Sequence, residues 1–388
     1  MAHEQETNAV SDAVQMVLDE GLDGLGPAVS VLLNEAMKIE RSRALGAGPW
    51  QRTPERNGYA NGYKPRTLKT RLGKLELAVP QVRGEVDFYP SALERGQRSE
   101  RALKLALAEM YVQGVSTRNV TEVLETMCGT AVSSSEVSRA ATLLDEELQK
   151  WRSRPLGAVP YVVLDARYEK VRRDGAVVSC AVLIASGVDA DGHRAILGVS
   201  VSMSEAEVHW REYLRNLKER GIHGLQMITS DDHDGLKAAL RATFPGVPWQ
   251  RCQVHLQRNA AGYVPKADMR GQVAQTIREI FTAPDREEAQ RLLDKATGKY
   301  QKTASKLAAW MSENLPEGFT AFSLPLKLRR RLRSTNMSEW VNKEIRRRTR
   351  VAGLFPNEAS LLRLVSATLV EISEDWETGK RYISLDDE

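Results

Sequence analysis

The stretch "YVVLDARYEKVR", residues 161–172, begins with a continuous apolar run that ends in Asp165. A short apolar run with β-branched residues is typical of a buried strand in a covered sheet. A carboxylate directly after such a strand lies at the carboxyl edge of the sheet, where α/β folds bind ligands. Aspartate also ends strands because it favours turns, so Asp165 alone does not establish a site.

The residues after this stretch predict the rest of the sheet. Two more strands and then alternating helices and strands follow: "VVSCAVLIASGV" (177–188), "RAILGVSVS" (194–202), a helix from Glu205 to Arg220, "LQMITSD" (225–231), a helix from Gly235 to Ala242, and "WQRCQVH" (249–255). Helical periodicity returns over residues 262–315. This order indicates an α/β fold with a mixed sheet, covered by helices and carrying a helical insertion.

Two further acidic residues occur at informative positions. Asp231 ends the predicted strand "LQMITSD", as Asp165 ends the first strand. Glu339 lies inside the arginine-rich segment "STNMSEWVNKEIRRRTR", residues 334–350. The simplest alternative for Glu339 is a charged surface helix in which one glutamate softens the repulsion between arginines.

The segment 334–350 predicts a helix, since Ser334 or Thr335 can cap it and no Pro or Gly interrupts it. One side of this helix is apolar and comprises Met337, Val341 and Ile345, with Trp340 at its edge. Glu344 and Arg348 fall on that side at a spacing where they can pair. The opposite side presents basic and polar residues around Glu339: Asn342, Lys343, Arg346 and Arg350.

Three carboxylates at one edge of a sheet would suit phosphodiester chemistry. Mg²⁺ and Mn²⁺ prefer oxygen ligands, and two such ions roughly 3.5–4 Å apart activate the attacking hydroxyl and stabilise the leaving oxygen. We therefore expect Asp165, Asp231 and Glu339 to hold two Mg²⁺ or Mn²⁺ ions per active site. The basic and polar side chains beside Glu339 would hold the DNA backbone.

The whole chain is nearly neutral, whereas two of its segments are strongly basic. Its 388 residues carry 55 Lys and Arg against 51 Asp and Glu, a net charge of +4. Eight Lys or Arg and two Glu lie in residues 51–83, and ten Lys or Arg and two Glu lie in residues 327–350. Such clusters attract phosphates even when the total charge is small.

The sequence shows no secretory or membrane signal. Its first residues lack a basic stretch followed by an apolar core, and no run of about 18 apolar residues occurs. The three cysteines, Cys128, Cys180 and Cys252, are far apart and give no disulfide framework. We therefore expect a cytoplasmic protein without a membrane partner.

A helical lead and a basic β region open the chain. Residues 8–45 carry helical periodicity and predict a helical lead over 1–48, and "GAGPWQRTPERNGYANGYKPRT", residues 46–67, has the composition of a loop. "TLKTRLGKLELAVPQV" alternates around the Leu72-Gly73-Lys74 turn and predicts a β-hairpin within the region 49–97. Four basic side chains would contact DNA there: Lys64, Arg66, Lys69 and Arg71. An ordinary basic hairpin fits the same pattern.

The region 98–155 is helical throughout and contains the pattern of a helix-turn-helix. The first helix would run from Thr117 to Met127, and the capping box Ser133-x-x-Glu136 would open the second, after a turn at Gly129. The shared core would comprise Val120, Leu124, Val137, Ala141 and Leu144. The start of the second helix would meet base edges through Ser134, Ser135, Ser138 and Arg139. Two packed helices with a Gly turn also occur in proteins that never bind DNA.

Together these stretches resemble the Mutator-type transposases of bacterial insertion sequences. The resemblance spans about Asn57 to Tyr382 and rests on motifs in one order, among them "YVQGVSTRNV", "SSSEVSR", "LDARYEKVR", "SDDHDGLKAAL", "WQRCQVHLQRN" and "TNMSEWVNKEIRRRTRVAGLFPN". It implies a ribonuclease H-like catalytic core at 156–260 and 326–388, separated by a helical insertion at 261–325.

The family's catalytic triad, carried over residue by residue, falls on Asp165, Asp231 and Glu339. Its Cys/Asp-x-x-His motif falls on Cys252 and His255, for which we expect a structural role near the active site. The chain departs from the family at Asp232, where a small residue usually follows the second aspartate. Neighbouring residues of a strand point to opposite faces, so either Asp231 or Asp232, but not both, can face the metal ions.

The resemblance implies a bacterial, nucleoid-associated DNA transposase. It would bind the terminal inverted repeats of its own element through its N-terminal half and cut a strand with the help of Mg²⁺. The freed 3′-hydroxyl would then attack target DNA. The resemblance also implies that the element moves replicatively through a circular intermediate. Two double-stranded DNA ends in one complex imply a homodimer or higher oligomer. Two alternatives stay open: a metal-dependent nuclease or resolvase without strand transfer, and a DNA-binding regulator without metal.

Aromatic and thiol side chains allow two further interpretations. Trp210 and Trp249 could stack on an unstacked base, although Trp210 also fits an apolar helical pattern with Leu214 that is typical of a core. Cys252 and His255 could bind zinc. Structural zinc takes four protein ligands, however, and no second pair lies at a suitable spacing.

Overall fold

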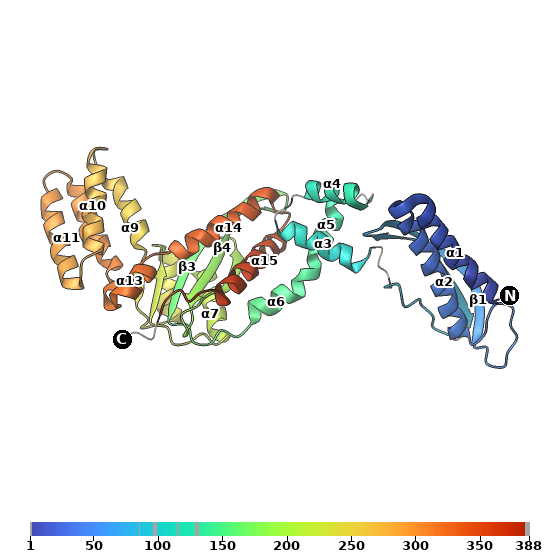
Figure 1. Ribbon diagram of the computed structural model, residues 1–388. Coiled ribbons are helices and arrows are strands. Elements are labelled where there is room, and N and C mark those ends of the chain that lie inside the picture. The colour runs from blue at the N-terminus through green and yellow to red at the C-terminus, as the bar shows by residue number, and fades with distance from the viewer. Residues whose placement is uncertain are drawn as a thin grey trace. The chain divides into compact units, whose positions relative to one another are not determined.

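The computed structural model describes residues 2–84, 86–95, 99–113, 115, 117–128 and 132–384, without the side chains of residues 2–7, 101, 117, 127, 128, 134 and 138. The chain divides into two compact units, Met1–Leu143 and Leu144–Glu388 (Figure 1). No helix in these described ranges is both long and apolar enough to cross a membrane.

The first unit begins with two helices and a long β-hairpin. Its elements are α1 (Ala2–Glu20), η1 (Gly21–Gly24), α2 (Leu25–Leu45), β1 (Gly58–Thr70) and β2 (Gly73–Gly84). Met37 of α2 is fully buried against Leu75 and Leu77 of β2. The hairpin reverses between Thr70 and Gly73, which form its last pair. The predicted hairpin is therefore present, with α2 covering one of its faces.

The hairpin is longer than the sequence predicts. Residues 58–67, predicted as a loop, form most of β1, where Tyr63 pairs with Pro80 and Thr67 with Glu76. The Gly and Asn residues that indicated a loop accompany a bulge after Ala60 instead. The loop prediction was wrong because the backbone partners of this stretch are supplied by β2, which local composition does not report.

Helices complete the first unit: α3 (Arg101–Val112), α4 (Thr117–Cys128), α5 (Ser134–Ala141) and η2 (Thr142–Leu144). The predicted capping box of Ser133 and Glu136 opens α5. Glu136 also forms an ion pair with Lys69 of the hairpin at 2.8 Å. The predicted core residues are buried except Leu144, which is half-buried. Gly129 lies outside the described residues.

The second unit is built on a five-stranded mixed sheet. Its strands are β3 (Tyr161–Arg173), β4 (Ala176–Val188), β5 (Arg194–Ser202), β6 (Met227–Ser230) and β7 (Trp249–Arg251), in the order β5-β4-β3-β6-β7. β3, β4 and β5 pair antiparallel, whereas β6 and β7 continue parallel to β3. The connecting helices are α7 (Glu207–Glu219) and α8 (Asp234–Thr243). The predicted α/β fold with a mixed sheet is confirmed.

Two predicted strand ends are wrong. β3 does not end at Asp165 but continues to Arg173, because β4 pairs with it along its whole length and Asp165 lies opposite Ile184. The strand "WQRCQVH" ends at Arg251, and a helix begins at Gln253. β7 is an edge strand, and it pairs only with the short β6. Local composition does not report how far a strand pairs with its neighbour, so it could not predict where β3 and β7 end.

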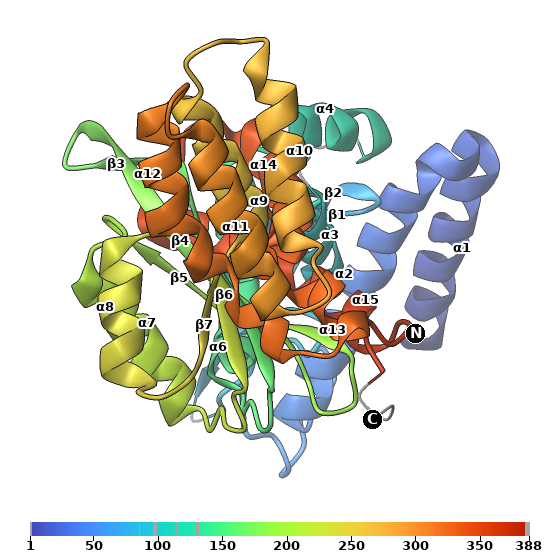
Figure 2. The ribbon, with the colours of Figure 1, turned by 90° about the vertical axis from the view of Figure 1, so that its left-hand side faces the viewer.

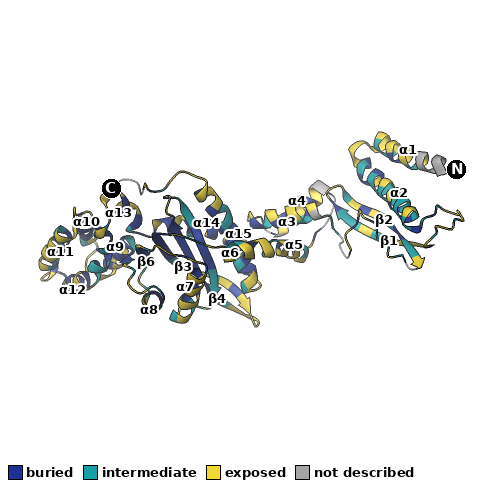
Figure 3. Ribbon diagram, turned by 90° about the horizontal axis from the view of Figure 1, so that it is seen from below, coloured by how far each residue is buried: buried dark blue, intermediate teal, exposed yellow. Residues whose placement is uncertain are grey.

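The sheet is covered on both faces (Figures 1 and 2). Val162 and Leu164 of β3 pack with Trp210 of α7, which is fully buried and therefore a core residue. Tyr161 packs instead with Leu332 of α13. The other helices of this unit are α6 (Asp145–Ser153), α13 (Leu326–Leu332), α14 (Asn336–Ala352) and α15 (Glu358–Glu377). Figure 3 shows the strands buried between these layers.

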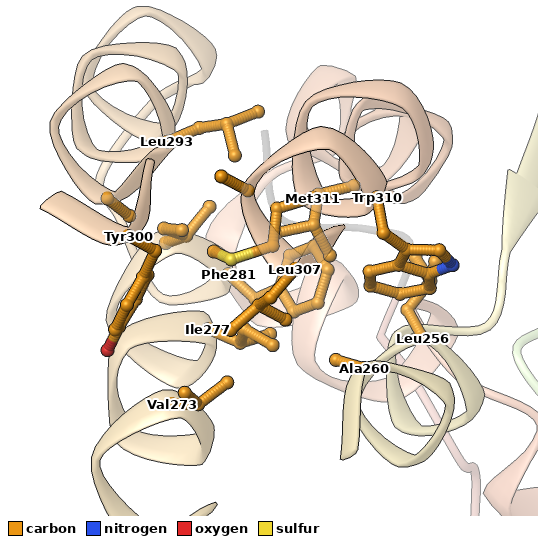
Figure 4. Packing of buried hydrophobic residues seen from close by; sticks show 14 of the residues in the cluster. Leu256, Ala260, Val273, Ile277, Phe281, Leu293, Tyr300, Leu307, Trp310 and Met311 are labelled. Carbon is orange, nitrogen blue, oxygen red and sulfur yellow. The ribbon is translucent and has the colours of Figure 1, made fainter. Parts of the chain in front are cut away.

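Four helices between β7 and α13 form a block with a core of its own (Figure 4). They are α9 (Gln253–Ala260), α10 (Met269–Phe281), α11 (Arg286–Tyr300) and α12 (Ser305–Asn314). Ile277, Leu307 and Met311 are fully buried in it. Two short helical turns, η4 (Leu315–Gly318) and η5 (Thr320–Ser323), return the chain to the sheet. There the Gln253 amide donates to the Gly318 carbonyl at 2.8 Å.

Leu307→Ala should lower the free energy of unfolding of the second unit by about 2–5 kcal/mol, because it leaves a cavity in the core of this block. Leu326, also in the second unit, is 69% exposed, and Leu326→Ala serves as the matched control. Thermal unfolding followed by circular dichroism compares the two variants. Equal midpoints would contradict the burial of Leu307.

Candidate active site

Asp165 and Asp231 are brought together by the parallel pairing of β3 with β6. Val163 is the partner of Thr229 in this ladder, so each aspartate lies two residues further toward the carboxyl edge. Neighbouring strands are about 4.8 Å apart, and residues two positions apart share a face. The Thr229 hydroxyl donates to Leu332 O of α13 at 2.8 Å. Asp165 therefore belongs to the face that α13 and α14 cover, and Asp231 is the first residue after the end of the neighbouring β6.

Burial and nearby charges, among them Asp231, shift the pKa of Asp165. Burial is the main cause that raises the pKa of Asp165 to about 6. The carboxylates of Asp231 and Glu205 add to the rise, whereas the Ala166 N–H and His255 oppose it. A carboxyl group beside other carboxylates in a partly enclosed position favours the uptake of positive charge.

Asn342 of α14 holds the Asp165 carboxylate. Its Nδ2 donates to Asp165 Oδ2 at 2.7 Å, while the Ala166 N–H donates to Oδ1 at 2.9 Å. The Asn342 carbonyl accepts a hydrogen bond from Arg167. α14 docks by the predicted apolar side, whose Met337, Val341 and Ile345 are buried. Asn342, a predicted DNA contact, is thus engaged inside the protein.

The start of α14 is positioned by Cys252. Thr335 is the N-cap residue but makes no side-chain capping bond. Its N–H and hydroxyl instead lie 3.3 and 3.4 Å from Cys252 Sγ. The predicted side-chain cap was wrong because the buried thiol takes the Thr335 hydroxyl, a long-range contact that helix-capping rules do not include.

His255, in the first turn of α9, stands beside Asp231. Its Nδ1 lies 3.6 Å from Asp231 Oδ1. Cys252 is the main cause that raises the pKa of His255 to about 9, and Asp231 and Asp165 add to the rise against the effect of burial. Burial would raise the pKa of the Cys252 thiol, but hydrogen bonds with His255 and Thr335 lower it overall. The raised pKa favours the protonated form of His255, which places positive charge beside Asp231.

Glu339 lies one helical turn before Asn342 but is held by a different partner. Its Oε1 forms an ion pair with Arg258 Nη1 of α9 at 2.9 Å. Within the described residues, no three His, Cys, Asp or Glu side chains are grouped closely enough to hold a metal ion. The structure thus brings Asp165 together with Asp231 and His255, and it pairs Glu339 with a cation.

Asp232 is engaged separately from Asp231. Arg251 Nη2 lies 2.9 Å from Asp232 Oδ2, and the other oxygen of this carboxylate accepts from Lys237 of α8. Asp231 faces His255 and accepts the Asp232 N–H at 2.7 Å. The two neighbours therefore have different partners on different elements.

The exposed side of α14 carries the remaining predicted DNA contacts of this helix: Lys343, Arg346 and Arg350. The predicted Glu344–Arg348 pair is absent. Glu344 pairs with Arg347 at 3.0 Å, and Arg348 pairs with Glu371 of α15 at 2.8 Å. That prediction was wrong because Arg348 is buried, and α15 supplies its partner.

The predicted DNA contacts of the first unit differ in their partners. Lys64, Ser135 and Arg139 are exposed. Three others have partners within the unit: Arg66 donates to Glu94 O at 3.0 Å, Lys69 pairs with Glu136 at 2.8 Å, and Arg71 pairs with Glu100 at 3.3 Å. The side chains of Ser134 and Ser138 lie outside the described residues.

Three residues of this site were missed from the sequence. Arg258 follows His255 by three positions, a spacing that shares one helix face, but residues up to 255 were predicted as strand. Arg251 lies in the same stretch, 249–255, all of which was predicted as strand. Glu205, which influences the pKa of Asp165, precedes α7 and carries no sequence signal.

Comparison with known proteins agrees with this architecture. The family model described as "Transposase, Mutator family" matches residues 1–379. The chain is 54% identical over 387 residues to the transposase for insertion sequence element IS406 of Burkholderia multivorans, covering 99% of this chain and 100% of the relative. It is 45% identical to the transposase for ISRM5 of Rhizobium meliloti (98% and 96% covered) and 35% identical to that for IS256 in transposon Tn4001 of Staphylococcus aureus (97% and 97%). This chain therefore belongs to the Mutator family of transposases, enzymes that act on DNA.

Proposed function

We propose that this chain is an Asp-Asp-Glu transposase that binds the terminal inverted repeats of its own insertion sequence, cuts DNA and joins the freed 3′-hydroxyl to target DNA. The observation that carries the proposal is the pairing of β3 with β6, which sets Asp165 beside Asp231 under α14. The relatives named above are all transposases for insertion sequence elements, which supports the same activity.

We assign the sheet of the second unit to the ribonuclease H-like class. Three consecutive antiparallel strands, joined to two parallel strands through helices, support this assignment. The positions of Asp165 within β3 and of Asp231 directly after β6, on neighbouring parallel strands, support it further. In the first unit, α4 and the capped α5, with Ser135 and Arg139 exposed, support a helix-turn-helix role in DNA binding.

The chemistry of two of the predicted ligands supports a divalent metal cofactor. Asp165 and Asp231 offer hard oxygen ligands, and their mutual repulsion contributes to the raised pKa of Asp165, which favours a bound cation. We propose that these two residues and Glu339 hold two Mg²⁺ or Mn²⁺ ions, which would activate the attacking hydroxyl and stabilise the leaving oxygen. Asn342 would orient Asp165 through its hydrogen bond. Glu339 would bind a metal ion after its ion pair with Arg258 is broken.

The DNA backbone would lie along the exposed side of α14, where Lys343, Arg346 and Arg350 supply positive charge. Lys64, Ser135 and Arg139 of the first unit would contact the terminal repeat. An enzyme that holds two DNA ends at once needs at least two copies of each site, so we propose a homodimer or higher oligomer.

A strand-transfer assay tests this function directly. Purified protein is incubated with pre-cut terminal ends, a plasmid target and Mg²⁺. Joined products are the expected result. Hydrolysis without joining would favour the nuclease alternative, and DNA binding without any reaction would favour the regulator.

Asp165→Asn and Glu339→Gln should each lower the rate of strand cleavage more than about 100-fold, because a metal ligand contributes more than an outer-shell partner. Each variant keeps the size of the side chain and removes its charge. Gel-shift titration should show nearly unchanged binding to terminal-repeat DNA. A parallel loss of binding and cleavage would count against a metal-binding role.

Asn342→Ala should lower the cleavage rate about 10–100-fold, because Asp165 loses the donor that orients it. Asn216→Ala, at an exposed position of α7, is the matched control and should cleave normally. Binding to terminal-repeat DNA separates this role from a DNA contact. If Asn342→Ala weakened binding as much as cleavage, Asn342 would act on DNA rather than on Asp165.

A further inference from the structure

We propose that Arg251 is a positioning residue that keeps Asp232 away from the metal-binding carboxylates, so that Asp231 alone serves the active site. This inference rests on the proposed function. Arg251 is the last residue of β7 and is only 3% exposed. Its guanidinium lies 2.9 Å from Asp232 Oδ2 and 2.8 Å from Glu317 Oε2. One planar side chain thus joins two acidic residues.

Both oxygens of Asp232 are engaged by cations. Arg251 holds Oδ2, and the ammonium of Lys237 donates to Oδ1. Lys237 also lies 3.4 Å from Asp234 Oδ1. Each positive charge in this cluster faces at least one carboxylate, so the charge of Asp232 is compensated by Arg251 and Lys237.

Such a restraint is needed because Asp231 and Asp232 are adjacent and lie beyond the end of β6. Strand geometry therefore does not by itself hold Asp232 on the opposite face. A free carboxylate there would be a second hard oxygen ligand next to Asp231 and would bind a divalent ion at a displaced position. The guanidinium suits this task, since its fixed fork of donors can bridge two carboxylates and stays charged at any working pH.

Arg251 is itself anchored to the segment that returns from the helical block. Its Nη1 donates to Asn314 Oδ1 at 2.9 Å, in addition to the pair with Glu317. Gln250 reinforces the attachment, because its Oε1 accepts the Ala321 N–H at 2.6 Å. The position of Asp232 is thereby tied to the end of the helical block as well as to β7.

The test compares Arg251→Gln with the double variant Arg251→Gln/Asp232→Ala. Arg251→Gln should lower the cleavage rate about 10–100-fold, the usual effect of losing an outer-shell partner. Mn²⁺ binding on pre-cut ends without target, followed by electron paramagnetic resonance, should be at least as tight as in the wild type. The double variant should recover most of the lost cleavage, because the competing carboxylate is gone.

A merely structural role predicts the opposite pattern. Arg251→Gln would then bind Mn²⁺ more weakly, and removing Asp232 as well would leave cleavage equally low or lower; either result overturns the inference. Arg241→Gln, on the exposed surface of α8, controls for the loss of one arginine. If Arg251→Gln does not fold, Arg251→Lys replaces it, with a smaller loss that Asp232→Ala should again reverse.

The two proposals fail in distinguishable ways. A wild-type chain that binds its ends but never cleaves them overturns the proposed function and this inference together. A wild-type chain that cleaves, with a double variant no better than Arg251→Gln, overturns only the role of Arg251.

Discussion

The parallel ladder between β3 and β6 is the constraint on which the site depends. A shift of one residue in this ladder would turn the side chains of β6 to the other face and displace Asp231, the residue after β6, relative to Asp165. The register is held by burial, because Leu164 and Ile228 pack against α7 and α8 while Tyr161 and Met227 pack against α13. Apolar side chains on both faces therefore place the two carboxylates near each other. Like charges repel, and the repulsion by Asp231 contributes to the raised pKa of Asp165.

Helix α14 carries both Asn342, which binds Asp165, and Glu339, which pairs with Arg258, and the packing of the helix sets their positions. Its buried apolar side fixes the rotation of the helix, and this rotation points Asn342 at Asp165. Cys252 binds Thr335, the N-cap residue of the helix, which restrains the position of the helix along its axis. The exposed arginines are left on the other side. Packing thus decides which polar residues of α14 serve the carboxylates and which remain available to a polyanion.

One short segment supplies a cation to Asp231, Asp232 and Glu339. Arg251 pairs with Asp232, His255 lies beside Asp231, and Arg258 pairs with Glu339. All three cations come from the end of β7 and the start of α9, next to the helical block. The helical block is therefore linked to these three carboxylates through ion pairs from one short segment.

The sequence by itself determined the mixed α/β sheet, the capped α5, the apolar side of α14 and the family. These features follow from periodicity and from motifs, which are local. It did not determine the length of β1 or β3, the end of β7, or the partners of Asn342, Thr335 and Arg348. The partner strands β2, β4 and β6 decided the lengths of β1, β3 and β7, and Asp165, Cys252 and α15 supplied the partners of the three side chains. Pairing and charge compensation act across space, so only the tertiary structure could assign them.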